Sequence, residues 1–129
     1  MTTWNTEKFE TFTFISAQYD VRAAKQILAS KKRTPKIHQL AVADVEPLLA
    51  KHTKEGNVEM ITMGVTVDWS RAESDPTIDL DVPIIVAQTA QGNFLPIDGY
   101  HRIAKAVKVG KTHLPCVVLN KAETKKILL

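Results

Sequence analysis

The fold of this chain is decided by residues 82–119, which read VPIIVAQTAQGNFLPIDGYHRIAKAVKVGKTHLPCVVL. Two short apolar runs, 82–87 and 93–97, are separated by a polar connection of hairpin length. Gly92 stands in this connection at a point where left-handed backbone geometry is expected. The stretch therefore begins with a predicted β-hairpin.

A helix and a further strand are predicted after this hairpin. Apolar residues recur at helical spacing over 99–109, and Gly110 ends the pattern. The face expected to point inward carries Ile103, Ala106 and Val107. Lys105 and Lys108 are then expected to point outward. With an apolar run over 114–119 as the last strand, the order of elements predicts an α+β (mixed α/β) domain, a mixed sheet with flanking helices.

The junction between the hairpin and the helix, residues 97–102, reads Ile-Asp-Gly-Tyr-His-Arg. Asp98 is expected to cap the helix, whose first N–H groups lack intrahelical acceptors and lie at the positive end of the helix dipole. His101 and Arg102 in the first turn complete a predicted anion site. The dipole contributes about 0.3–1 kcal/mol and one hydrogen bond from Arg102 about 1.5–3 kcal/mol. Micromolar affinity needs about 8 kcal/mol, so the rest of the ligand must supply most of the binding.

Each residue of this turn has a functional and a structural interpretation. Arg102 either binds phosphate or pairs with a carboxylate from the middle of the chain. His101 either donates to a phosphate and acts as an acid or base, or is a polar capping residue. Asp98 is an N-cap, or it is catalytic or binds Mg²⁺, and Tyr100 either stacks on a base or packs. The candidate phosphate- and nucleotide-binding residues are Gly99, Tyr100, His101, Arg102 and Lys105, and the candidate catalytic residues are His101 and Asp98.

Outside this stretch the sequence predicts several short elements. Residues 11–17 are prone to form a strand, and Asp20 is expected to cap a helix over 21–31. A strand is expected over 36–40, and Asp44 is expected to cap a short helix. The remaining predicted elements are a half-buried strand over 61–69, an acidic surface loop over 70–81, and a last helix that starts with a capping box of Asn120 and Glu123 and continues to 129.

Composition and charge restrict the class of protein. The chain has 129 residues and a formal net charge of +3, which fits one domain over 1–129. After Gly99 seven lysines and arginines face one acidic residue, Glu123. They form either a solvated helix face or a basic surface that attracts nucleotides or nucleic acid. No membrane span, secretory signal or zinc-like histidine spacing occurs, so a cytoplasmic protein without a metal site is expected, and the single cysteine, Cys116, is expected to be buried.

The ordered features of residues 82–119 resemble the ParB/sulfiredoxin superfamily: a strand with proline, a hairpin, the Asp-Gly-X-His-Arg turn, a helix ended by glycine and a strand opened by Leu-Pro. The resemblance covers about a third of the chain. It implies that Gly99, His101 and Arg102 hold nucleotide phosphates. Members of the superfamily include ParB proteins that bind CTP and partition DNA, nucleases, sulfiredoxins that use ATP, and a free-serine kinase that uses ADP.

Departures from the superfamily pattern argue against two of these activities. Tyr100 stands where sulfiredoxin chemistry needs a cysteine, so sulfiredoxin activity is not expected. The chain ends soon after its last predicted strand, whereas ParB partition proteins continue into a DNA-reading domain, so partitioning by this chain alone is not expected. The predicted strand over 61–69 lies where ParB proteins usually have helix.

Two hypotheses follow. The first is a nucleotide-binding domain, with CTP, ATP or ADP and Mg²⁺ as candidate ligands, that acts as a nucleotide hydrolase, nuclease or phosphotransferase. The second is a non-catalytic DNA-associated or protein-interaction module that uses the basic C-terminal third.

Overall fold

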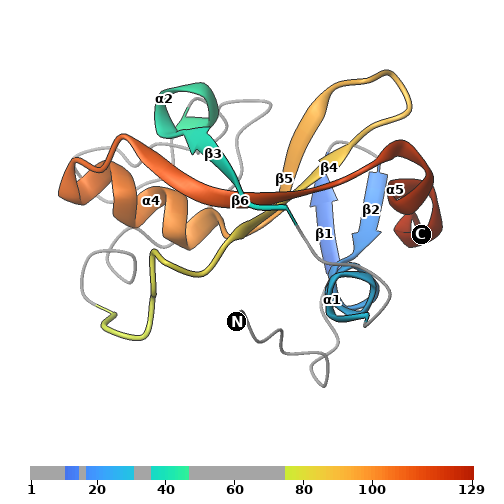
Figure 1. The fold of residues 1–129 in the computed structure, drawn as a ribbon, viewed down its shortest axis with the longest axis horizontal. Helices are drawn as coiled ribbons and strands as arrows, with labels where there is room; N and C mark the ends of the chain where they lie inside the picture. The colour runs from blue at the N-terminus through green and yellow to red at the C-terminus, as the bar shows by residue number, and fades with distance from the viewer. Residues whose placement is uncertain (1–10, 15–16, 31–35, 47–74) are drawn as a thin grey trace.

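The computed structural model describes residues 11–14, 17–30, 36–46 and 75–129 (Figure 1). Its elements, in chain order, are β1 (Thr11–Phe14), β2 (Ala17–Asp20), α1 (Val21–Ala29), β3 (His38–Ala41), α2 (Val42–Val45), β4 (Ile84–Gln88), β5 (Phe94–Asp98), α4 (Tyr100–Val109), β6 (His113–Leu119) and α5 (Lys121–Ile127).

Four of the strands form one mixed sheet in the order β3-β6-β4-β5. Strands β4 and β5 form the expected antiparallel hairpin, and Gly92 in its connection has φ +88°. The helix α4 then returns the chain to β6, which pairs parallel with β4 and antiparallel with β3. Strands β1 and β2 form a separate antiparallel pair. The α+β class and the mixed sheet are thus confirmed.

Helices cover both faces of this sheet. As a result, successive side chains of the central strands are buried alternately in two clusters, one on each face. Ile84 and Val86 of β4 belong to the cluster beneath α2 and α4, whereas Ile85 and Ala87 belong to the cluster beneath α1 and α5. In Figure 1, α2 and α4 lie on the left of the molecule and α1 and α5 on the right. A strand buried on both faces reads as a continuous apolar run, which explains why β4 shows no polar alternation.

Several helix ends are where the sequence places them. The Asp20 carboxylate accepts a hydrogen bond from the Ala23 N–H at 2.9 Å and so caps α1. Asn120 and Glu123 form the predicted capping box at the start of α5. Gly110 ends α4 in the left-handed conformation, with φ +77°. Each of these ends is encoded locally, by a residue and its immediate neighbours.

Other details differ from the prediction. Asp44 lies inside α2, whose N-cap is Ala41, because β3 leads directly into this short helix. Helix α1 ends at Ala29 and α5 at Ile127, each earlier than predicted. The predicted strand over 61–69 lies outside the described residues. Cys116 is buried, as expected, and burial raises the pKa of its thiol.

Candidate functional site

The turn between β5 and α4 is built around Gly99. Gly99 is the N-cap of α4 and adopts the left-handed conformation, with φ +106° and ψ 19°. The prediction that Asp98 caps the helix is wrong, since Asp98 is still part of β5 and pairs with Ile85. No side chain caps α4 from its N-cap position. The chain thus enters the helix one residue later than the sequence suggests.

Asp98 instead forms an ion pair with Arg102. The Asp98 Oδ2 atom lies 3.0 Å from Nη2 of Arg102, four residues further along the chain. Both side chains are largely buried, with exposed fractions of 20% for Asp98 and 12% for Arg102. If Arg102 forms an ion pair, the sequence predicts a partner carboxylate from the middle of the chain. The structure instead shows that the partner is Asp98, the last residue of β5. The carboxylate offsets part of the positive charge at the turn.

Arg102 also binds two backbone carbonyls that precede β4. Its Nη1 atom donates to the carbonyl oxygens of Val82 at 2.9 Å and Pro83 at 3.0 Å. Together with Asp98, these acceptors take three hydrogen bonds within the described part of the chain. A guanidinium group has five N–H donors. Arg102 is therefore held rigidly while keeping the capacity to donate to a further acceptor.

The guanidinium of Arg102 lies against the backbone of Gly99. A Cβ atom at position 99 would lie 2.9 Å from Nη2 and 3.1 Å from Nε of Arg102. It would also lie 2.9 Å from Cγ1 of Ile84. Because glycine has no Cβ, the charged group can approach the start of α4. The guanidinium group and the positive end of a ten-residue helix are thereby fixed at one point.

Tyr100, by contrast, packs inside the protein. Only 7% of the residue is exposed, and its hydroxyl donates to the Pro96 carbonyl oxygen at 2.8 Å. Burial raises the pKa of this hydroxyl well above its ordinary value. Of its two interpretations, packing is the one observed, and any ligand contact from Tyr100 would involve its backbone N–H.

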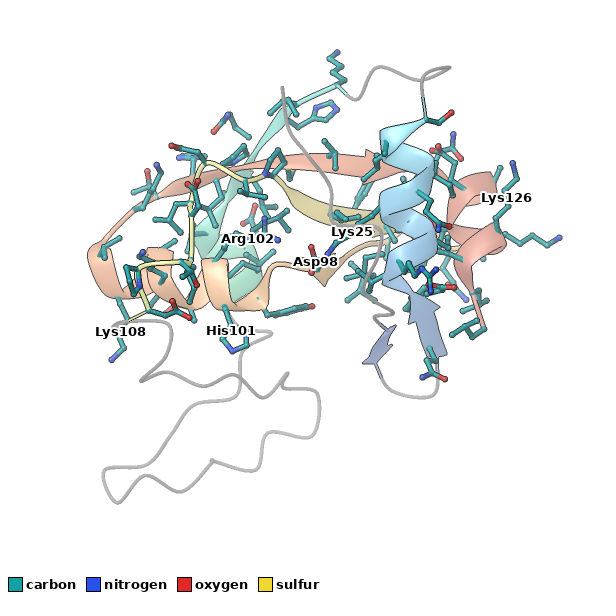
Figure 2. All side chains as sticks on the ribbon, turned by 90° about the horizontal axis from the view of Figure 1, so that it is seen from below. Lys25, Asp98, His101, Arg102, Lys108 and Lys126 are labelled. Atoms are coloured by element: carbon teal, nitrogen blue, oxygen red, sulfur yellow. The ribbon has the colours of Figure 1, made fainter. Side chains whose placement is uncertain are left out.

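His101 and Lys105 lie four residues apart on α4, a spacing that puts them on neighbouring parts of the helix surface. His101 is half-buried, and Figure 2 shows its side chain pointing away from the sheet. Lys105 is also half-buried, and its Nζ atom donates to the Ile78 carbonyl oxygen at 2.7 Å. The prediction that Lys105 points into solvent is therefore wrong, whereas Lys108 is exposed as expected.

Three cations of the C-terminal third lie at two separate helix ends. Lys108 of α4 and Lys126 of α5 lie at opposite ends of the molecule in Figure 2. Lys108 occupies the last turn of α4, and Lys125 and Lys126 occupy the last turn of α5. Cations at these positions complement the helix dipoles, which accounts for them without a ligand.

Within the described ranges no group of three or more histidine, cysteine or acidic side chains could hold a metal ion. Among those same residues, no helix is long and apolar enough to cross a membrane. Comparisons of the chain with protein-family models, curated proteins and solved structures find no match.

Sequence reasoning missed the partners of Arg102 and Lys105. The carbonyl oxygens of Val82, Pro83 and Ile78 accept from side chains 19 to 27 residues away. Since every residue carries a carbonyl group, no residue type marks these positions as acceptors.

Proposed function

We propose that the β5–α4 turn binds a phosphate group of a nucleotide or nucleic acid. The observation that carries this proposal is the fixed position of the Arg102 guanidinium against Gly99, at the N-terminus of α4. The first N–H groups of a helix point outward along its axis and favour anions. A phosphate at this point can accept from the backbone of the turn and from Arg102 together.

Hydrogen-bonding capacity favours a phosphate over a smaller anion at this turn. Because Asp98 is paired with Arg102, the pair carries no net formal charge, and an anion must be held mainly by directed N–H donors. A phosphate offers several acceptor oxygens, which suits the broad donor set of guanidinium and backbone N–H groups. The dipole and one arginine supply about 2–4 kcal/mol, so a base or a polymer must supply the rest of a useful affinity.

The roles of the individual residues follow from their contacts. Arg102 and the turn backbone hold the phosphate, and His101 donates to it or serves as an acid or base. Asp98 keeps Arg102 in position through their ion pair. The resemblance of residues 82–119 to the ParB/sulfiredoxin superfamily supports the same ligand class, with CTP, ATP or ADP, alone or with Mg²⁺, as the candidates. Hydrolase, nuclease or phosphotransferase activity would rest on His101.

Nucleotide-dependent stabilisation tests the proposal. A ligand at a hundred times its dissociation constant stabilises a folded protein by about 2.7 kcal/mol. We expect CTP, ATP or ADP, with or without Mg²⁺, to raise the melting temperature of the protein. The His101→Ala variant should lose part of this rise, because His101 lies in the first turn of α4, where it can donate to the phosphate.

The matched control is His113→Ala, which removes an exposed histidine at the start of β6. This variant should keep the full nucleotide-dependent rise. If no nucleotide stabilises the protein and it binds DNA with a steep salt dependence, the alternative of a DNA-associated module replaces the proposal. Equal rises in both histidine variants would exclude His101 as a donor to the bound phosphate.

A further inference from the structure

Residues 75–83, called here the strap, run beside α4 before entering β4 (Figure 1). The strap contains turns and no helix or strand. Two of its aspartates fold it locally: the Asp75 carboxylate accepts from the N–H of Thr77 at 2.8 Å, and the Asp79 carboxylate accepts from the N–H of Asp81 at 2.9 Å. Its shape is thus set by short-range hydrogen bonds.

The strap is fastened to α4 by apolar and polar contacts. Ile78 is buried, with 8% exposed, and Leu80 packs against the core cluster beneath α2 and α4. Lys105 donates to the carbonyl oxygen of Ile78, and Arg102 donates to those of Val82 and Pro83. Two of the candidate phosphate-binding residues therefore hold the strap through its backbone.

The contacts divide the guanidinium of Arg102 between two partners. Its Nη1 atom is held by the Val82 and Pro83 carbonyls of the strap, whereas Nη2 and Nε lie beside Gly99 at the turn. A planar guanidinium held at one end cannot rotate freely at the other. The position of the strap consequently fixes the direction in which Arg102 can donate at the turn.

We propose that the strap is a positioning element for the phosphate site, so that closure of the strap and binding of a phosphate stabilise each other. This inference rests on the proposed function of the β5–α4 turn. Coupling of this kind is reciprocal: if the closed strap raises phosphate affinity by a given factor, bound phosphate favours the closed strap by the same factor. Couplings between sites are typically about 5–150-fold.

Hydrogen exchange in the wild-type protein tests one direction of the coupling. With saturating inorganic pyrophosphate, the amides of residues 77–82 should exchange at least about fivefold more slowly than without it. Amides of α5, which lies on the other face of the sheet, should keep their exchange rates. Pyrophosphate binding that leaves strap exchange unchanged would overturn the inference and leave the proposed function standing.

The other direction is tested by Ile78→Ala, which loosens the strap without removing any donor of the site. Its pyrophosphate affinity, measured by calorimetric titration, should fall by about five- to tenfold. The control is Ile127→Ala, which removes a buried isoleucine from the opposite cluster, and its affinity should stay within about twofold of wild type. Unchanged affinity in Ile78→Ala despite faster strap exchange would overturn the inference. Absence of pyrophosphate binding to the wild type would overturn both proposals.

Discussion

Gly99→Ala is expected to lower the free energy of unfolding by about 2–6 kcal/mol, the sum of two separate costs. The first is backbone strain of about 1–3 kcal/mol, because φ is +106° at this position and side chains disfavour that region. The second is overpacking of about 1–3 kcal/mol, because the new Cβ would lie 2.9 Å from both Arg102 Nη2 and Ile84 Cγ1. Chemical denaturation of the purified variant measures the total.

Gly110→Ala separates these two costs. Gly110 also has a positive φ, of +77°, but no atom lies within 4 Å of the Cβ it would gain. Its loss should therefore be the strain alone, about 1–2 kcal/mol. An equal loss in the two variants would mean that Arg102 and Ile84 do not occupy the space beside Gly99. A larger loss in Gly99→Ala supports the close approach of the guanidinium to the turn.

Arg102→Met is expected to destabilise the protein by about 2–4 kcal/mol and to abolish nucleotide binding. Methionine retains much of the apolar stem of the side chain but none of its donors. The change leaves the Asp98 carboxylate and the Val82 and Pro83 carbonyls without the donor they now share. In a domain of this size the melting temperature should fall by about 6–15 °C, measured by thermal denaturation.

Lys108→Met is the control for this change, since it removes a cation from the exposed end of the same helix. Surface substitutions of this kind usually change stability by less than about 0.5 kcal/mol. If Arg102→Met were no more destabilising than Lys108→Met, the hydrogen bonds of Arg102 would contribute nothing to the fold. Its loss of nucleotide binding could then be assigned to the phosphate alone.

The elements that the sequence predicts well are those with local signals. The hairpin of β4 and β5, the helix α4 and the strand β6 follow from apolar spacing and two glycines, and the start of α5 follows from a capping box. The apolar runs of β4 and β6 indicated burial, and both strands indeed lie between two core clusters. Local signals suffice here because caps and hairpin turns involve residues close in the chain.

The turn between β5 and α4 lies where the sequence predicts a strand to end and a helix to begin, but its hydrogen bonds differ from those predicted. Asp98 followed by Gly99 predicts that Asp98 is the N-cap. In the structure Gly99 is the N-cap, in the left-handed conformation, and the Asp98 carboxylate forms an ion pair with Arg102. Lys105 looked solvent-facing because helical spacing cannot show that a distant segment packs over it. The first error comes from the backbone conformation of one residue, and the second from a tertiary contact that overrides a local pattern.

The central claim is that the β5–α4 turn receives a phosphate, and amide chemical shifts in a nuclear magnetic resonance titration test it most directly. On addition of CTP, ATP or ADP, the largest shifts should occur at the amides of Gly99, Tyr100, His101 and Arg102, at the start of α4. Smaller shifts should follow in the strap. Shifts centred on the lysines of α5, or no shifts at millimolar nucleotide, would contradict the claim.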